Sequence, residues 1–356
     1  MASLERAHWF LRESCDLKRC TYCFGPIPEG EVSPERDFKI AQVLVDGGVK
    51  EVVLGGGEPS LARSLEEVMR ILKDGGIYIS LHTNGLSLTD ERLDRWVGLV
   101  DDIALPIDAV DRTIQGQLRE EKFMEVFDNL MRWADKINSR GIKMGWHTVF
   151  TALNGSEIPK IYQLVQGKPF KYWRIYEYNS DLARQAWLTM NGPNDTSDER
   201  IIAGFLRARA LEGSGTPEKG YTDCLLADFL RMEEKMERLG DNRIQFVARV
   251  DNKEEPYAFC RNDGQVDYYA WYSGTQRREL GNILKEGFPI VKERWVRIRD
   301  MDDFDEDDRA DADCDLPLWA RLDDGFYLAE EIEEVLPEYI PEVERLADLW
   351  AKRNGL

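Results

Sequence analysis

The chain has 356 residues, of which 43% are hydrophobic, so it can bury the core of one large α/β domain and a smaller second one. Its formal net charge of −20 argues against free nucleic acid as a partner, because a phosphate backbone is bound through Lys and Arg. No apolar segment approaches a membrane-spanning length, the first residues lack a secretory pattern, and six cysteines are too few for a secreted disulfide scaffold. We therefore expect a cytoplasmic protein without membrane contact.

The first half of the chain alternates predicted strands with predicted helices. The strands are expected to begin near residues 7, 51, 77, 102, 142 and 172, with a helix between each pair. Ser33 is an expected helix cap, and Ser64 with Glu67 is an expected capping box for the next helix. This alternation predicts right-handed parallel crossovers, and six units are too few to close an eight-stranded barrel. We predict an α/β fold, a partial (β/α)6 TIM-like barrel.

The second half of the chain follows a different pattern. The barrel is expected to occupy residues 1–185, and residues 186–356 are expected to form a smaller α+β domain that caps the active site. Within that domain, residues 243–250 and 265–271 are predicted strands of a small antiparallel sheet.

Three of the six cysteines fall within nine residues, directly after the first predicted strand. Cys15, Cys20 and Cys23 have the spacing C-x4-C-x2-C, and no fourth Cys or His follows to close a tetrahedral zinc site. This pattern favours an iron–sulfur cluster with one iron left open. A zinc knuckle and three incidental thiols are the alternatives. The remaining cysteines are scattered and have no ligand spacing: Cys224, Cys260 and Cys314.

Further candidate residues follow the predicted strands. In a parallel β/α barrel the loops after the strands meet at one face, where the glycine turn 55–59, His82, Asp108 and His147 should come together. His82 and His147 are therefore candidates for contacting substrate or moving a proton, whereas His8, at the start of its strand, is expected in the core. On the last strand we expect three side chains to point inward as substrate contacts: Arg174, Tyr176 and Tyr178.

Three motifs in this order resemble the radical S-adenosylmethionine (SAM) superfamily. They are Cys-Thr-Tyr-Cys-Phe at 20–24, Gly-Gly-Glu-Pro at 56–59 and Thr-Asn-Gly at 83–85. Members of that superfamily are partial (β/α)6 barrels, and their usual cysteine spacing is C-x3-C-x2-C. This chain has four residues between its first two cysteines. The resemblance therefore does not determine the conformation of its cysteine loop.

The resemblance implies roles for individual residues. Cys15, Cys20 and Cys23 would hold a [4Fe-4S] cluster whose fourth iron binds SAM, with a flavodoxin or ferredoxin as electron donor. Glu58 could instead act as a helix N-terminal acid, and Arg119 could be a solvated surface charge. The SAM contacts that we expect are Tyr22, Gly56, Gly57, Glu58, Asn84, Asp108 and Arg119.

A second resemblance lies downstream. Asp-Gly-x-Val at 263–266 and Leu-Gly-Asn-Ile at 280–283 look like the twitch or SPASM extensions, which hold an additional Fe-S cluster in many relatives. The cysteine that normally follows the Asp-Gly turn is absent, so we do not expect a second Fe-S cluster here. The strand 173–176, together with the Gly-Gly-Glu-Pro and Asn-Gly motifs, also resembles viperin-like nucleotide radical enzymes.

The expected function is that of a radical SAM enzyme acting on a small molecule. It would cleave SAM reductively and take hydrogen from a small polar metabolite of nucleoside, nucleotide or sugar type in a biosynthetic pathway. One alternative is a maturase of a ribosomally synthesised peptide, which makes a peptide substrate possible. Another is a non-catalytic Fe-S or zinc-binding protein, although a structural metal site would not need a glycine cradle for SAM.

Overall fold

The computed structural model describes residues 6–12, 14–17, 20–23, 33–119, 121–178, 229, 231–247, 258–269 and 277–300. They form one ten-stranded sheet in the order β10-β9-β8-β1-β2-β3-β4-β5-β6-β7. Its strands are β1 (Arg6–Arg12), β2 (Glu51–Gly56), β3 (Tyr78–His82), β4 (Asp102–Pro106), β5 (Lys143–Phe150), β6 (Tyr172–Glu177), β7 (Ile244–Val247), β8 (Ala258–Cys260), β9 (Gln265–Tyr269) and β10 (Arg277–Asn282).

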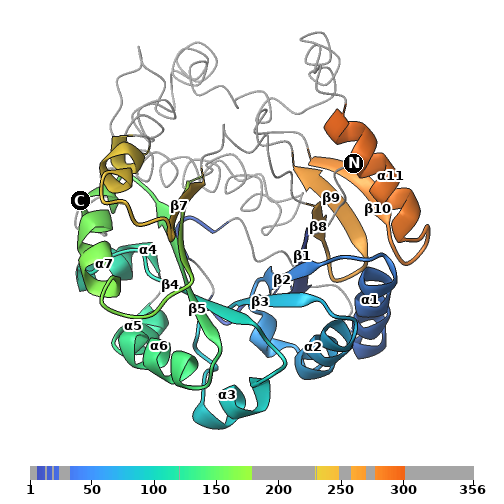
Figure 1. Ribbon diagram of the computed structural model, residues 1–356, viewed down its shortest axis with the longest axis horizontal. Coiled ribbons are helices and arrows are strands. Elements are labelled where there is room, and N and C mark those ends of the chain that lie inside the picture. Colours follow the sequence, from blue (N-terminus) through green and yellow to red (C-terminus); the bar gives the residue numbers. More distant parts are fainter. Residues whose placement is uncertain are drawn as a thin grey trace, which may run out of the picture.

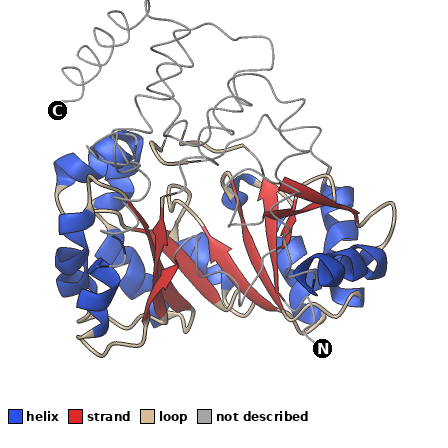
Figure 2. Ribbon diagram, turned by 90° about the horizontal axis from the view of Figure 1, so that it is seen from above, coloured by secondary structure: helices blue, strands red, loops and turns tan. Residues whose placement is uncertain are grey.

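The helices lie on the outer side of the curled sheet (Figures 1 and 2). They are α1 (Pro34–Asp46), η1 (Pro59–Leu61), α2 (Leu65–Asp74), α3 (Asp90–Trp96), α4 (Arg112–Leu118), η2 (Glu121–Phe123), α5 (Met124–Phe127), α6 (Leu130–Ser139), η3 (Gly155–Glu157), α7 (Ile158–Val165) and α11 (Phe288–Asp300). No helix among the described residues is long and apolar enough to cross a membrane.

Eight described strands, from β8 through β1 to β7, are paired in parallel and curl into an open half-barrel. Strands β1 to β6 begin at or next to the six expected positions, which confirms the predicted partial TIM-like barrel. Side chains along β1 alternate between the two faces of the sheet. Trp9 and Leu11 are fully buried toward the helices, while His8 points to the barrel interior.

The pairing of the later strands differs from the expected small antiparallel sheet. Strand β7 extends the barrel in parallel with β6, so the antiparallel expectation for residues 243–250 is wrong within the described part. Strand β8 pairs in parallel with β1 at the other edge, and only β8, β9 and β10 are antiparallel to one another. An open half-barrel has two unpaired edges, and these strands cover them. The domain division at residue 185 lies outside the described residues and stays a prediction.

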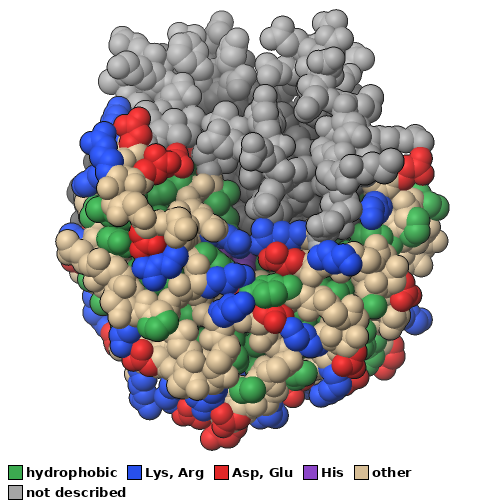
Figure 3. All heavy atoms as spheres, viewed as in Figure 1, with side chains coloured by type: hydrophobic (Ala, Val, Ile, Leu, Met, Phe, Trp, Pro, Cys, Tyr) green, Lys and Arg blue, Asp and Glu red, His purple; other side chains and the backbone are tan. Residues whose placement is uncertain are grey.

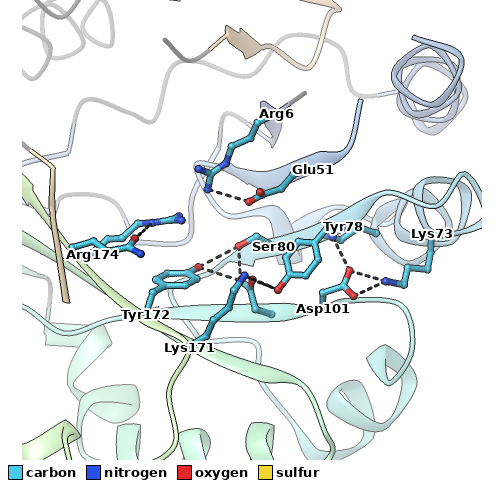
Figure 4. Close-up of polar contacts among 12 residues, drawn as sticks. Arg6, Glu51, Lys73, Tyr78, Ser80, Asp101, Lys171, Tyr172 and Arg174 are labelled. Carbon is cyan, nitrogen blue, oxygen red and sulfur yellow. Dashed lines mark hydrogen bonds and ion pairs between the residues drawn. The ribbon is translucent and has the colours of Figure 1, made fainter. Parts of the chain in front are cut away.

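A buried carboxylate near the N-terminal end of the barrel strands is surrounded by hydrogen-bond donors. Asp102 is fully buried and accepts hydrogen bonds from the hydroxyls of Tyr78 at 2.7 Å and Tyr172 at 3.0 Å. Lys171 forms an ion pair with it at 3.0 Å, and Figure 4 shows Tyr78, Lys171 and Tyr172 pointing toward one another. The ring of Tyr172 reaches Asp102 because Gly145 lies under it; a Cβ there would be 2.5 Å from the ring.

Asp102→Asn is expected to lower the free energy of unfolding by about 2–3 kcal/mol. The amide removes the charge that pairs with Lys171 and replaces an acceptor oxygen by a donor facing the tyrosine hydroxyls. Urea unfolding measures the change. The matched control is Asp135→Asn, because the pair between Asp135 and Lys168 is more than a third exposed and should contribute less than about 1 kcal/mol. Equal losses in both variants would contradict the burial argument.

Candidate functional site

The three clustered cysteines follow β1, are half-buried and are not joined in disulfides. Amide and guanidinium donors lie beside two of them: Asn84 Nδ2 is 3.7 Å from Cys15 Sγ, and Arg119 Nη1 is 3.6 Å from Cys20 Sγ. Burial raises the pKa of Cys15 to about 12, so an iron that binds this sulfur must displace a proton. N–H groups directed at sulfur are typical of the surroundings of iron–sulfur clusters.

The arrangement of the three thiols is compatible with a cluster. Within the described residues, no three His, Cys, Asp or Glu side chains are close enough together to hold one metal ion. Each thiolate of a [4Fe-4S] cluster binds a different iron, so its ligands do not need to meet at one point. The cluster at these cysteines and the zinc knuckle considered above both stay predictions.

A glycine turn fixes the end of β2 against the segment that precedes Cys15. Gly57 N donates to Arg12 O at 2.8 Å, and Glu58 N donates to Ser14 O at 2.8 Å. Gly56 has φ = 111°, and a Cβ at this position would overlap the carbonyl oxygen of Arg12. Only glycine allows the two backbones to approach this closely, so the turn and the cysteine loop form one unit.

Glu58 is buried, with 1% of its surface exposed, and both of its carboxylate oxygens are engaged. Oε1 accepts from Ser60 N at 3.0 Å and from Thr83 Oγ1 at 2.7 Å, while Oε2 accepts from Asn84 N at 2.7 Å. Burial raises the pKa of Glu58, and these hydrogen bonds oppose the rise. The carboxylate caps η1, as the helix-acid alternative expects, and it ties the 83–85 loop to the turn. Its contact with the SAM ammonium stays a prediction.

Asp108, Arg119 and Tyr22 form a second buried group. Asp108 Oδ2 accepts from Tyr22 OH at 2.7 Å and from Arg119 Nε at 2.6 Å. Arg119 also lies 5.3 Å above the Tyr22 ring, and its side chain is only 10% exposed, so it is not a solvated surface charge. Asp108 is the group that holds Tyr22 and Arg119 beside Cys20. The expected contact of Asp108 with the ribose of SAM stays a prediction.

A buried ion pair joins the end of β1 to α1, and the sequence analysis did not predict it. Arg12 Nη2 lies 2.9 Å from Asp37 Oδ2 and 3.2 Å from Ser64 Oγ. The Ser64 hydroxyl donates to Asp37 at 2.5 Å and makes no cap hydrogen bond, so the expected capping box with Glu67 is wrong. The hydroxyl of Ser64 instead donates to the Asp37 carboxylate on α1 and accepts from the Arg12 guanidinium, and hydrogen bonds to charged groups are stronger than one to a neutral backbone N–H.

Asp37→Asn is expected to cost about 3 kcal/mol of unfolding free energy, because the Arg12 charge would stay buried without its counter-charge. Urea unfolding of the metal-free and reconstituted protein measures this loss. Glu66→Gln is the control, since the ion pair of Glu66 with Arg95 is exposed and should change stability by less than about 1 kcal/mol. A change in Asp37→Asn as small as in the control would show that the pair does not stabilise the fold.

The inner wall of the barrel brings together most of the expected substrate contacts. The rings of His82 and His147 are 4.0 Å apart, and Tyr176 packs edge-on against His147 at 5.3 Å. Arg174 lies on the same face of β6 as Tyr176. His8, expected in the core, instead faces His82 across the interior at 6.4 Å. The ring of Tyr178 is 3% exposed and belongs to the hydrophobic core.

Comparison with known proteins identifies the first half of the chain. The model of the radical SAM superfamily matches residues 13–165. An S-adenosylmethionine-dependent nucleotide dehydratase of Thermoplasmatales archaeon (strain ISO4-H5) is 29% identical over 127 residues, which cover 35% of this chain and 46% of that protein. A protein of the same name from Lacinutrix mariniflava is 23% identical over 191 residues, covering 48% and 40%. The chain thus spans less than half the length of these relatives.

Solved structures share the fold. Streptococcus suis SuiB bound to precursor peptide SuiA superposes with a TM-score of 0.60 at 13% identity, covering 84% of this chain and 67% of SuiB. SuiB bound to S-adenosylmethionine gives a TM-score of 0.58 at 15% identity. At such identities the likeness concerns the fold alone. The family match covers the strand ends that carry the cysteines, the glycine turn and Asn84, so residues 13–165 of the chain form a radical SAM domain.

Proposed function

We propose that Cys15, Cys20 and Cys23 hold a [4Fe-4S] cluster, that SAM binds beside it, and that the enzyme takes hydrogen from a small polar metabolite of nucleoside, nucleotide or sugar type. The observation that carries this proposal is the linked cysteine loop and glycine turn, in which N–H donors lie beside the sulfurs and Gly56 allows the turn to contact the backbone of β1 directly. The nucleotide dehydratases among the relatives support a nucleotide-type substrate.

When bound, the cluster and SAM supply one-electron cleavage of SAM to methionine and a 5'-deoxyadenosyl radical that abstracts hydrogen. The chain's own residues hold and shield these groups. Asn84 and Arg119 donate to the sulfurs of Cys15 and Cys20, and Asp108 fixes the orientation of Arg119. The backbone of Gly56 and Gly57, with Glu58 behind it, forms the side of the SAM site. A low-potential donor, flavodoxin or ferredoxin, would supply the electron.

The substrate side of the proposal rests on the barrel interior. His82, His147, Arg174 and Tyr176 line this wall and would contact the substrate. Burial lowers the pKa of both histidines well below the ordinary value, so their rings are neutral and can donate or accept a hydrogen bond. Tyr178 lies just beyond β6, and its buried ring would support the wall from the core.

Anaerobic reconstitution with iron and sulfide tests the proposal. The protein should become brown, bind about four irons per chain, and form 5'-deoxyadenosine from SAM when dithionite is added. Colourless protein that binds zinc and leaves SAM intact would refute it. About eight irons would instead indicate a second cluster. Of the cysteines available for one, Cys260 is buried in the core, while Cys224 and Cys314 lie outside the described residues.

The same assay distinguishes the substrate classes. Nucleosides, nucleotides and sugar phosphates are added in turn, and the rate of 5'-deoxyadenosine formation is compared with the rate without substrate. A nucleotide-type substrate should accelerate SAM cleavage and appear as a changed product by mass spectrometry. If only a precursor-type peptide accelerates the reaction, the alternative of peptide maturation replaces the metabolite proposal.

A further inference from the structure

All three histidines of the chain line the interior of the barrel. His8 comes from β1, His82 from β3 and His147 from β5, so three separate strands bring them to one surface. The His8 and His82 rings are 6.4 Å apart, and those of His82 and His147 are 4.0 Å apart. Figure 3 shows histidine in a hollow near the centre of this face, with Lys and Arg side chains and an acidic side chain around it.

Two of these histidines have an unsatisfied polar atom. The Nε2 atoms of His82 and His147 are buried and have no hydrogen-bond partner within the described part of the chain. Leaving a buried polar nitrogen unpaired costs about 1–3 kcal/mol, and folded proteins rarely tolerate it without a ligand or water. Two such atoms on adjoining rings therefore indicate a binding surface for polar groups.

Two guanidinium groups act on the same rings. Burial is the main cause that lowers the pKa of His82 and His147. The charge of Arg174 comes next for His147, whereas for His82 the other two histidines come before Arg174, and Arg6 adds to the lowering of both. Arg174 is held in place, because its guanidinium stacks 4.2 Å from the Tyr172 ring and its Nε donates to Gln245 at 3.0 Å. In Figure 4, Arg6 and Arg174 extend from separate strands into the same interior space.

Two guanidinium groups therefore lie at this surface in a protein whose net charge is −20. Arg6 pairs with Glu51 at 3.1 Å, and Arg174 Nε donates to the amide oxygen of Gln245. A fixed guanidinium is suited to anionic oxygen groups, because its N–H donors match the geometry of carboxylate and phosphate. Neutral imidazoles beside it can donate further hydrogen bonds to the same group.

We infer that His82, His147, Arg6 and Arg174 form an inner anion subsite, which binds a phosphate or carboxylate group of the substrate. This inference rests on the proposed function and specifies its substrate as an anion. Arg6 begins β1, and the glycine turn contacts the same strand six residues later, at Arg12. At about 3.3 Å per residue the two ends are about 20 Å apart. The charged end of an elongated substrate would bind at the inner anion subsite, and its reacting end would extend past His82 toward Asn84.

Calorimetric titration of the reconstituted protein with pyrophosphate, and separately with succinate, tests the inner anion subsite. We expect at least one of the two anions to bind the wild type, and Arg174→Gln to weaken that binding about tenfold or more. The matched control is Arg95→Gln, which removes the same charge from an exposed pair with Glu66 on the outside of the barrel. This control should bind the anion with wild-type affinity.

The two probes distinguish the two chemical sources of the anion. Binding of pyrophosphate alone assigns the subsite to phosphate, and binding of succinate alone assigns it to carboxylate. If neither binds the wild type, or if Arg95→Gln loses as much affinity as Arg174→Gln, the inner anion subsite is refuted. If the thermal melting curve shows that Arg174→Gln does not fold, Arg6→Gln, which changes the guanidinium on β1, is tested in the same titration.

The outcome is independent of the test of the proposed function. Wild-type protein that cleaves SAM but binds neither anion would leave the radical SAM chemistry standing and overturn only the subsite. Protein that binds pyrophosphate but never cleaves SAM would support the subsite and contradict the proposed reaction.

Discussion

Cys20→Ala is expected to lose the brown colour on reconstitution and to reduce 5'-deoxyadenosine formation at least about a hundredfold. Cys20 is one of three thiols available to the proposed cluster, and Arg119 Nη1 is directed at its sulfur. Without this ligand a second iron would be exposed, and the cluster would lose the hydrogen bond from the guanidinium. Iron analysis and chromatography of the SAM cleavage products measure both effects.

Cys260→Ala is the matched control for this substitution. Cys260 is also not in a disulfide, but it is 2% exposed in β8, where its backbone pairs with β1 and β9. The substitution removes a buried sulfur without touching the cysteine loop, so the iron content and SAM cleavage should equal those of the wild type. If Cys20→Ala keeps its iron, or if Cys260→Ala loses iron equally, the assignment of the cluster to the loop is wrong.

Gly56→Ala is expected to abolish SAM cleavage and to lower the free energy of unfolding by about 3 kcal/mol or more. Gly56 has φ = 111°, which an L-residue rarely adopts, and a Cβ would overlap the carbonyl oxygen of Arg12 and lie 3.0 Å from Phe10 Cα. Both neighbours are backbone atoms of β1 and cannot rotate away. Relief of the clash must therefore move the strand end that leads into Cys15.

Gly48→Ala isolates the steric part of this effect. Gly48 also has a positive φ, 76°, but a Cβ there would meet no atom within 4 Å. It should cost only about 1 kcal/mol and leave SAM cleavage unchanged. Urea unfolding, with SAM binding followed by calorimetry, compares the two variants. Equal effects would mean that the positive φ, and not the contact between the turn and β1, accounts for the loss.

The sequence by itself determined the β/α order of the barrel and the position of its chemical groups at the strand ends. Periodicity and turn residues are local signals, so β1 to β6 and the Ser33 cap of α1 form where the pattern predicts. The three motifs were sufficient for the radical SAM resemblance, which the family match over residues 13–165 confirms.

Only the tertiary structure decided which partners these residues have. The pattern of residues 243–250 indicates a strand but does not indicate which strand it pairs with. In the structure this strand, β7, pairs in parallel with the edge of β6. Ser64 donates to Asp37 and accepts no hydrogen bond from its own helix, and His8 faces the barrel interior beside the other two histidines. The physical reason is common to all three: a buried polar group or a strand edge binds the partner that folding brings to it from a distant part of the chain. Local sequence carries no record of that choice.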